Sequence, residues 1–260
     1  MNFWQADHHP ETLAVVEPCT GRQKTYGELL QDVKQTFLPS KRSLIMLSAQ
    51  NRYECLLTYL AALQSGNPLL LADPGLNREL LLQLVEKYCP AYIYNCPTEI
   101  ELPGYESRQA APITINERTT QESVVIHDSL ALLLNTSGST GSPKLVRLSR
   151  QNLQANAASI ASYLNLTADE RPITSLPMSY SYGLSVINSH LHAGATLVLT
   201  DYGVLRREFW DIVEQFSCTS FAGVPFTYQM LLQTGLLTKR GLTLRTLTQA
   251  GGALGDAYAS

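Results

Sequence analysis

This sequence of 260 residues lacks a strong excess of positive or negative charge. It sets 19 Lys and Arg against 22 Asp and Glu, for a net charge of −3, with no long block of either sign. Nucleic-acid binding needs a basic patch or stripe that neutralises phosphates, and the sequence offers none. We therefore expect no nucleic-acid partner.

Cysteine is scarce, and its spacing is irregular. The chain has five cysteines and no C-x-x-C pair. A disulfide framework needs an even number of cysteines and a zinc knuckle needs a C-x-x-C pair, so the thiols are predicted to be reduced and mostly buried. The cysteines are Cys19, Cys55, Cys89, Cys96 and Cys218.

A metal-ligand cluster is also missing from the sequence pattern. His190 and His192 are spaced like alternate residues on one face of a strand, but no third ligand accompanies them. Structural zinc sites hold four ligands and catalytic ones three, so we predict no protein metal site here.

Long apolar runs are absent as well. Met1–Thr20 contains no apolar stretch of signal-peptide length. The longest stretch without Asp, Glu, Lys or Arg lies between Arg171 and Asp201, and prolines, a glycine and several serines interrupt it. A spanning helix needs about 20 mostly apolar residues, so we interpret this stretch as buried or pocket-lining. The prediction is a cytoplasmic protein without a membrane span.

Short apolar runs alternate with segments of helical period from about Ser43 onward. Ser43–Ser48 is typical of a buried strand, and the next segment is predicted to be a helix that Asn51 caps and Gly66 ends. This alternation predicts an α/β fold, with largely parallel sheets and helices on both faces. Asn95–Asn116, rich in proline, has no period and is predicted to be a surface connection.

The other predicted elements continue the alternation. Further strands are expected at Pro68–Ala72, Ala91–Tyr94, Leu130–Leu134, Lys144–Leu148, Thr196–Thr200, Thr219–Ala222 and Arg245–Gln249. Further helices are expected around Leu80–Val85, from about Gln151 to Leu164, and at Arg206–Phe216 and Phe226–Leu232.

Hydroxyl residues and glycines gather in one segment that ends in a lone lysine, Thr136-Ser137-Gly138-Ser139-Thr140-Gly141-Ser142-Pro143-Lys144. Glycines let backbone N–H groups turn toward an anion, hydroxyls donate further hydrogen bonds, and lysine supplies a mobile positive charge. The composition therefore favours a polyphosphate cradle. It is not the P-loop of NTPases, because Pro143 stands where that loop has Gly before its Lys. Taken alone, such a cluster is also typical of a solvated loop.

These nine positions resemble the phosphate loop of the adenylate-forming enzymes, the superfamily of acyl-CoA synthetases, peptide-synthetase adenylation domains and luciferase. Two flanking positions depart from the family pattern. Leu145 stands where glycine is usual, and Arg150 where histidine is common. Both departures concern the flank and leave the cradle itself intact.

Several other segments are similar to family segments and occur in the family's order. Tyr180 stands at the position of a family histidine. Alternatively, Tyr180 and Tyr182 are core aromatics, and Gly251-Gly252 merely ends a strand. The segments are Thr25-Tyr26-Gly27-Glu28-Leu29, Leu63-Gln64-Ser65-Gly66 with Asp73-Pro74, Leu176–Leu184, Gly223-Val224-Pro225 and Ala250-Gly251-Gly252-Ala253.

The resemblance implies the N-terminal part of the family's large domain, a three-layer α-β-α fold, over residues 1–260. Roughly residues 50–170 would form one α/β subdomain, and residues 1–49 with 171–260 part of a second, incomplete one. The family's small C-terminal domain would be absent, and the element pattern stops after Gly251-Gly252 as though cut. We therefore expect a fragment that catalyses no adenylation alone.

The resemblance also implies a reaction. A carboxylate attacks the α-phosphate of ATP to give an acyl-adenylate and pyrophosphate, and a thiol then takes the acyl group. Magnesium would share the phosphate charge, and coenzyme A or the phosphopantetheine of an acyl carrier protein would be the acceptor. Lys144 and Thr140 would be catalytic. The nucleotide would contact Thr136, Ser137, Gly138, Ser139, Thr140, Gly141, Lys144, Gly251, Gly252 and Ala253, and the acid Tyr180, Gly183, Gly223, Val224 and Pro225.

Two other hypotheses remain open from the sequence. One is a naturally short, non-catalytic module that binds a nucleotide or a carboxylate. The other is an unrelated ATP-dependent phosphotransferase, which would need a carboxylate pair for magnesium, and none stands beside the loop. The identity of the acid and of the thiol is not predicted.

Overall fold

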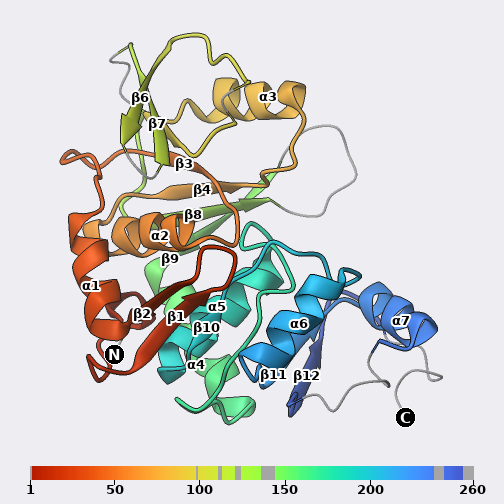
Figure 1. Ribbon diagram of the computed structural model, residues 1–260. Coiled ribbons are helices and arrows are strands. Elements are labelled where there is room, and N and C mark those ends of the chain that lie inside the picture. The colour runs from red at the N-terminus through yellow and green to blue at the C-terminus, as the bar shows by residue number, and fades with distance from the viewer. Residues whose placement is uncertain are drawn as a thin grey trace.

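The computed structural model describes residues 2–97, 99–110, 113–120, 124–135, 144–236 and 243–253. They form a mixed α/β fold in which helices pack on the faces of β-sheets (Figure 1), and this confirms the predicted fold class. The division into residues 50–170 and the remainder stays a prediction.

A seven-stranded sheet has the order β6-β7-β5-β3-β4-β8-β9. Its four central strands, β5, β3, β4 and β8, run parallel, whereas the outer strands pair antiparallel. The strands are β3 (Ile45–Ser48), β4 (Leu69–Ala72), β5 (Tyr92–Tyr94), β6 (Tyr105–Ala110), β7 (Ile113–Arg118), β8 (Leu130–Asn135) and β9 (Leu145–Ser149).

The central strands bury side chains on both faces, which explains why they are continuous apolar runs. On one face Met46 and Leu70 pack with Leu84 of α3 (Arg78–Tyr88). On the other face Leu47 packs with Leu60 of α2 (Tyr53–Ser65). Figure 1 shows the sheet between these two helices, so this part of the molecule has three layers.

The segment Asn95–Asn116 was predicted to be a surface connection, and this is wrong for its second half. β6 and β7 form an antiparallel hairpin at the edge of the sheet. β6 has no buried residue, so it carries no apolar alternation that could mark it as a strand. Backbone pairing to β7 holds it in place instead.

A second group of strands contains β1 (Leu13–Glu17), β2 (Arg22–Thr25) and β10 (Leu197–Val198). β11 (Ser220–Gly223) pairs in parallel with β12 (Thr246–Gln249). Pro172 bridges to β11 and Ile173 to β10, so these two residues connect the two small sheets. Two helices, α6 (Arg207–Gln215) and α7 (Pro225–Thr234), pack on β11 through an aromatic cluster. The cluster contains Phe209, Trp210, Phe221 and Tyr228.

Helices α4 (Arg150–Tyr163) and α5 (Ser181–Ala193) lie side by side near the seven-stranded sheet (Figure 1). α5 was not predicted as a helix, because its serines, Gly183 and Asn188 weaken the apolar period. His190 and His192 therefore lie on a helix, and the expectation of one strand face is wrong. The remaining α-helix, α1 (Tyr26–Gln35), begins at Thr25 with a capping box formed with Glu28, and a short 3-10 helix, Phe3–Gln5, precedes β1.

The two ends of α2 can be compared with the predicted capping residues. Gly66 ends the helix with φ of 84°, as predicted. Arg52, and not Asn51, is the N-cap residue, and its side chain makes no capping hydrogen bond. Asn51 is buried and bonds to another part of the chain, described below. Within the described residues, no helix is long and apolar enough to cross a membrane.

Candidate active site

The two strands β8 and β9 form a hairpin that carries the lysine at the end of the predicted phosphate loop. Asn135 pairs with Leu145 across this hairpin, and Lys144 is exposed beside that pair. β9 begins directly after Lys144, so the chain enters a strand here and not the helix that follows a P-loop lysine. The other predicted loop residues lie outside the described part of the chain; they are Thr136, Ser137, Gly138, Ser139, Thr140, Gly141, Ser142 and Pro143.

A cavity of about 700 Å³ adjoins this hairpin. Its walls come from β8 and β9, from α4, from the first turns of α5 and from the segment after β12. Leu134, two residues before Thr136, is one of the lining residues. The others are Leu148, Asn152, Leu153, Asn156, Tyr180, Ser181, Tyr182, Leu184, Ser185, Asn188, Ala250 and Gly251.

The fold brings five predicted site residues together at one side of this cavity. Gly251 has φ of +89°, a conformation that favours glycine, and a Cβ there would lie 3.1 Å from the Tyr180 Oη and 3.5 Å from Val224 Cγ1. A Cβ on Gly252 would lie 3.3 Å from Pro225 Cγ. Segments predicted separately for the acid and the nucleotide are therefore direct neighbours. Ala253, the last residue described, is exposed.

Gly183 is needed for packing. A Cβ on Gly183 would lie 2.3 Å from the Pro177 carbonyl oxygen and 2.8 Å from the Leu176 oxygen, so only glycine lets this segment cross the first turn of α5. Gly183 is buried and is not among the residues that line the cavity. Tyr180, which does line the cavity, is the N-cap residue of the same helix.

The buried Asn51 holds the same segment from the other side. Its Nδ2 donates to the Leu176 oxygen at 3.1 Å and to the Thr200 oxygen at 3.3 Å, and its Oδ1 accepts from the Met178 N–H at 2.9 Å. Sequence reasoning assigned Asn51 to a helix cap and missed this role. A polar residue three positions after a buried strand is the only signal that could have indicated it.

Gly223, like Gly183, does not line the cavity beside β8. It is buried, and a Cβ there would lie 3.0 Å from the Tyr228 ring. The Tyr228 hydroxyl donates to the Thr248 carbonyl oxygen at 2.7 Å, and the Tyr182 hydroxyl donates to the Thr248 Oγ1 at 2.7 Å. Burial raises the pKa of both phenols, so both stay protonated donors at neutral pH. The two tyrosines tie α5 and α7 to β12.

The two histidines of α5 face different partners. His190 Nδ1 lies 2.8 Å from the Val186 oxygen, and its Nε2 lies 3.3 Å from Ser220 Oγ. Since a carbonyl only accepts, Nδ1 carries the hydrogen, and burial lowers the pKa of this imidazole. His192 Nδ1 lies 3.2 Å from Gln154 Nε2. Among the residues with described positions, no three His, Cys, Asp or Glu side chains gather as a metal site.

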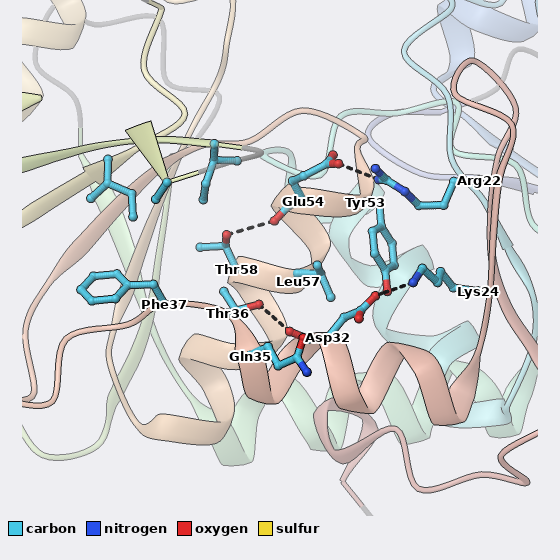
Figure 2. A pocket seen from close by; sticks show the side chains of 13 residues that line it. Arg22, Lys24, Asp32, Gln35, Thr36, Phe37, Tyr53, Glu54, Leu57 and Thr58 are labelled. Carbon is cyan, nitrogen blue, oxygen red and sulfur yellow. Dashed lines mark hydrogen bonds and ion pairs between the residues drawn. The ribbon is translucent and has the colours of Figure 1, made fainter. Parts of the chain in front are cut away.

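A separate cavity of about 470 Å³ lies between α1, α2, β2 and β7 (Figure 2). The charged side chains of its wall form ion pairs. Arg22 Nη1 lies 2.6 Å from Glu54 Oε1 and 3.1 Å from Oε2 of Glu17, which does not line the cavity, and Lys24 Nζ lies 2.8 Å from Asp32 Oδ2. Figure 2 shows Arg22, Lys24, Glu54 and Asp32 at one end and Phe37 at the other. This cavity shares no lining residue with the cavity beside β8, and its neutralised charges do not favour an anion.

Comparison with known proteins gives a family match over nearly the whole chain. The family described as AMP-binding enzyme matches residues 2–260. Oxalate–CoA ligase of Arabidopsis thaliana is 33% identical over 107 residues, which are 40% of this chain and 21% of the ligase. Malformin synthetase mlfA of Aspergillus niger (strain ATCC 1015) is 31% identical over 117 residues, which are 45% of this chain and 2% of the synthetase.

Solved structures show the same fold. o-Succinylbenzoate CoA synthetase (MenE) from Bacillus subtilis, in complex with its acyl-adenylate, has a TM-score of 0.75 at 22% identity, covering 97% of this chain and 54% of that one. ATP-bound MatB from Rhodopseudomonas palustris has a TM-score of 0.74 at 20% identity, covering 98% and 56%. This chain thus spans about half the length of these two structures.

Proposed function

This chain belongs to the AMP-binding enzyme family, and we propose that it activates a carboxylic acid with ATP to form an acyl-adenylate and pyrophosphate. One observation carries the proposal. The cavity beside the β8–β9 hairpin is lined by residues next to the predicted phosphate loop, and also by Tyr180 and Gly251 from the segments predicted for the acid and the nucleotide.

The relatives' names support the same chemistry. Oxalate–CoA ligase and o-succinylbenzoate CoA synthetase are each named for joining an acid to coenzyme A, and the second was solved with an acyl-adenylate. For this chain we propose ligation of a small carboxylic acid, with coenzyme A or a carrier-protein phosphopantetheine as the acceptor thiol.

In the proposed first step, a carboxylate oxygen attacks the α-phosphorus. The new O–P bond forms as the bond to the β-phosphate breaks, and pyrophosphate leaves with the electron pair. The carboxylate is already ionised, so no proton has to move. Catalysis then depends on holding two anions in line and offsetting the charge on pyrophosphate. In this proposal Lys144, at the end of the hairpin, supplies positive charge, and the hydroxyl residues before it, Thr140 among them, supply donors.

In the proposed second step, the thiol sulfur attacks the acyl carbon. A C–S bond forms, the C–O bond breaks, and AMP leaves with that oxygen while the thiol proton passes to solvent or phosphate. Tyr180, Val224 and Pro225, which surround Gly251 and Gly252, would border the acid and the adenylate. Gly183 and Gly223 would act by packing, because both lie buried behind the wall.

Whether described residues could bind magnesium depends on their metal-ligating side chains. The family resemblance implies Mg²⁺ on the phosphates, but the described residues bring no three metal-ligating side chains together. The roles proposed here for Lys144 and Tyr180 require no metal ligand from that part of the chain. We also propose a cytoplasmic location, because all five cysteines are unpaired, as is common in reducing compartments.

The test is carboxylate-dependent ATP–pyrophosphate exchange by the complete polypeptide in which this chain occurs. We expect exchange with one class of acid and a loss of at least about a hundredfold in Lys144→Ala, in the range found when a charge-stabilising group is removed. Lys41→Ala, at an exposed lysine before β3, is the matched control and should keep full exchange.

Absence of exchange with every acid, despite measurable ATP binding, would favour the alternative of a non-catalytic binding module. We further propose that residues 1–260 alone do not turn over, because they span about half of the structural relatives. Carboxylate-dependent ATP consumption by this purified chain would contradict that statement.

A further inference from the structure

Behind the cavity beside β8 lies a second, much smaller one. It holds about 40 Å³ between α4, α5, β11 and β12, enough for a few water molecules at most. Tyr182 and Ser185 line both cavities, and no other residue with a described position does. We call the cavity beside β8 the outer cavity and the small one the inner chamber. These two side chains of α5 therefore lie between the outer cavity and the inner chamber.

Tyr182 is held in that position. Its hydroxyl donates to Thr248 Oγ1 at 2.7 Å, which bridges from α5 to β12 across the chamber. Ser185 turns its hydroxyl back to the Tyr182 carbonyl oxygen at 2.8 Å, so it adds little to the barrier. The Tyr182 ring is thus the larger part of the partition. Substituting a small residue would join the inner chamber to the outer cavity.

The chamber behind Tyr182 is bordered by neutral groups. Phe221 and Ala222 of β11 contribute apolar surface, and His190 lies at its far side with its pKa lowered by burial. Of the described residues that line either cavity, none is a Lys, Arg, Asp or Glu. Their polar groups are hydroxyls, amides and this imidazole. A second carboxylate on the substrate would find no countercharge among them, and burying it unpaired is costly.

From this arrangement we infer that Tyr182 is the floor of the acid-binding site and restricts it to short monocarboxylic acids that carry no second charged group. The inference rests on the proposed function, since it assigns the outer cavity to the acid. Acids with longer chains are excluded because their terminal carbons would have to occupy the space of the Tyr182 ring. Tyr182 is a specificity-determining residue in this account, and it takes no part in the bond changes.

The first test compares acids from acetate to octanoate, with succinate as the charged member, in pyrophosphate exchange by the complete polypeptide. Wild type should prefer the short acids, with kcat/KM falling about tenfold for each methylene that meets the floor. Tyr182→Ala should move the optimum to longer acids, while Tyr182→Phe, which keeps the ring, should leave it in place. An unchanged optimum in Tyr182→Ala, or efficient use of octanoate or succinate by wild type, would overturn the inference.

A second measurement does not depend on turnover. Tyr182→Ala should leave a hole of the size of the lost phenol group that takes up phenol, as enlarged cavities in proteins bind small aromatic molecules. Phenol should therefore raise the Tm of Tyr182→Ala, and leave wild type and Tyr182→Phe unchanged. If phenol does not bind to folded Tyr182→Ala, the ring does not close a chamber and the inference is wrong. If phenol binds and no acid is activated by wild type, the failure belongs to the proposed function and not to the partition.

Discussion

The substitution Gly183→Ala distinguishes packing from substrate contact at a predicted site residue. Its Cβ would lie 2.3 Å from the Pro177 oxygen, whereas real Cβ atoms essentially never come closer than 3.0 Å, so the two must separate by about 0.7 Å. Neither neighbouring carbonyl is free to move. The Pro177 oxygen accepts from the Tyr180 N–H at 3.0 Å, and the Leu176 oxygen accepts from Asn51 Nδ2 at 3.1 Å.

Two opposing effects set the magnitude. Alanine is favoured over glycine in a helix by about 1 kcal/mol. Overpacking costs typically about 1–3 kcal/mol, and contact with fixed backbone puts this site at the upper end. We expect a net loss of about 2 kcal/mol of unfolding free energy. For a chain of this size that loss lowers Tm by about 4–8 °C.

Urea denaturation and thermal unfolding of the 260-residue chain measure this directly. Gly203→Ala is the matched control, because nothing lies within 4 Å of a Cβ at that position. The control should be neutral or stabilising by up to about 1 kcal/mol. A Gly183→Ala protein as stable as wild type, with only acid binding weakened, would refute the packing role.

Three further predictions concern the surroundings of the site. Asn51→Ala removes three hydrogen bonds to backbone groups, two buried and one part-buried, and should cost about 2–4 kcal/mol in urea denaturation, more than Gln50→Ala at the exposed neighbour. Gly251→Ala places a side chain at φ of +89° against Tyr180; pyrophosphate exchange should fall at least about tenfold, while unfolding loses only about 1–2 kcal/mol. Burial lowers the pKa of His190 below its usual 6.5, so the unfolded chain binds the proton more readily than the folded chain does. The neutral, buried imidazole therefore contributes its full stabilisation above pH 6.5, and this stabilisation is lost as the pH falls toward the lowered pKa. His190→Gln should flatten the dependence of unfolding free energy on pH below 6.5, and an unchanged slope would show that His190 does not cause it.

The alternation of apolar runs was enough to predict the central strands and α2, α3, α4, α6 and α7, because burial on both faces leaves a direct mark in the sequence. It failed where backbone pairing or close packing of the backbone decides the structure. β6 has no buried residue and is held by its pairing with β7. α5 contains Gly183 because the segment just before the helix, Leu176 and Pro177, crosses its first turn.

At the candidate site, the roles of the predicted residues stay a proposal, and only their positions in the fold can be compared. Family resemblance led to Tyr180, Val224 and Gly251, which the fold brings together. Asn51 and Tyr182 were not assigned roles there, because their partners, such as Thr248, are distant in sequence. Such roles arise from three-dimensional packing, which local sequence patterns do not predict. The resemblance to adenylate-forming enzymes is confirmed by the family match over residues 2–260.

Transfer of oxygen from the carboxylate tests the central claim most directly. The complete polypeptide would be given its acid labelled with ¹⁸O in the carboxylate, together with ATP and the acceptor thiol, and the products would be weighed by mass spectrometry. Attack on the α-phosphorus predicts AMP that carries one labelled oxygen, with unlabelled pyrophosphate. Formation of ADP with the label in inorganic phosphate would contradict adenylate formation.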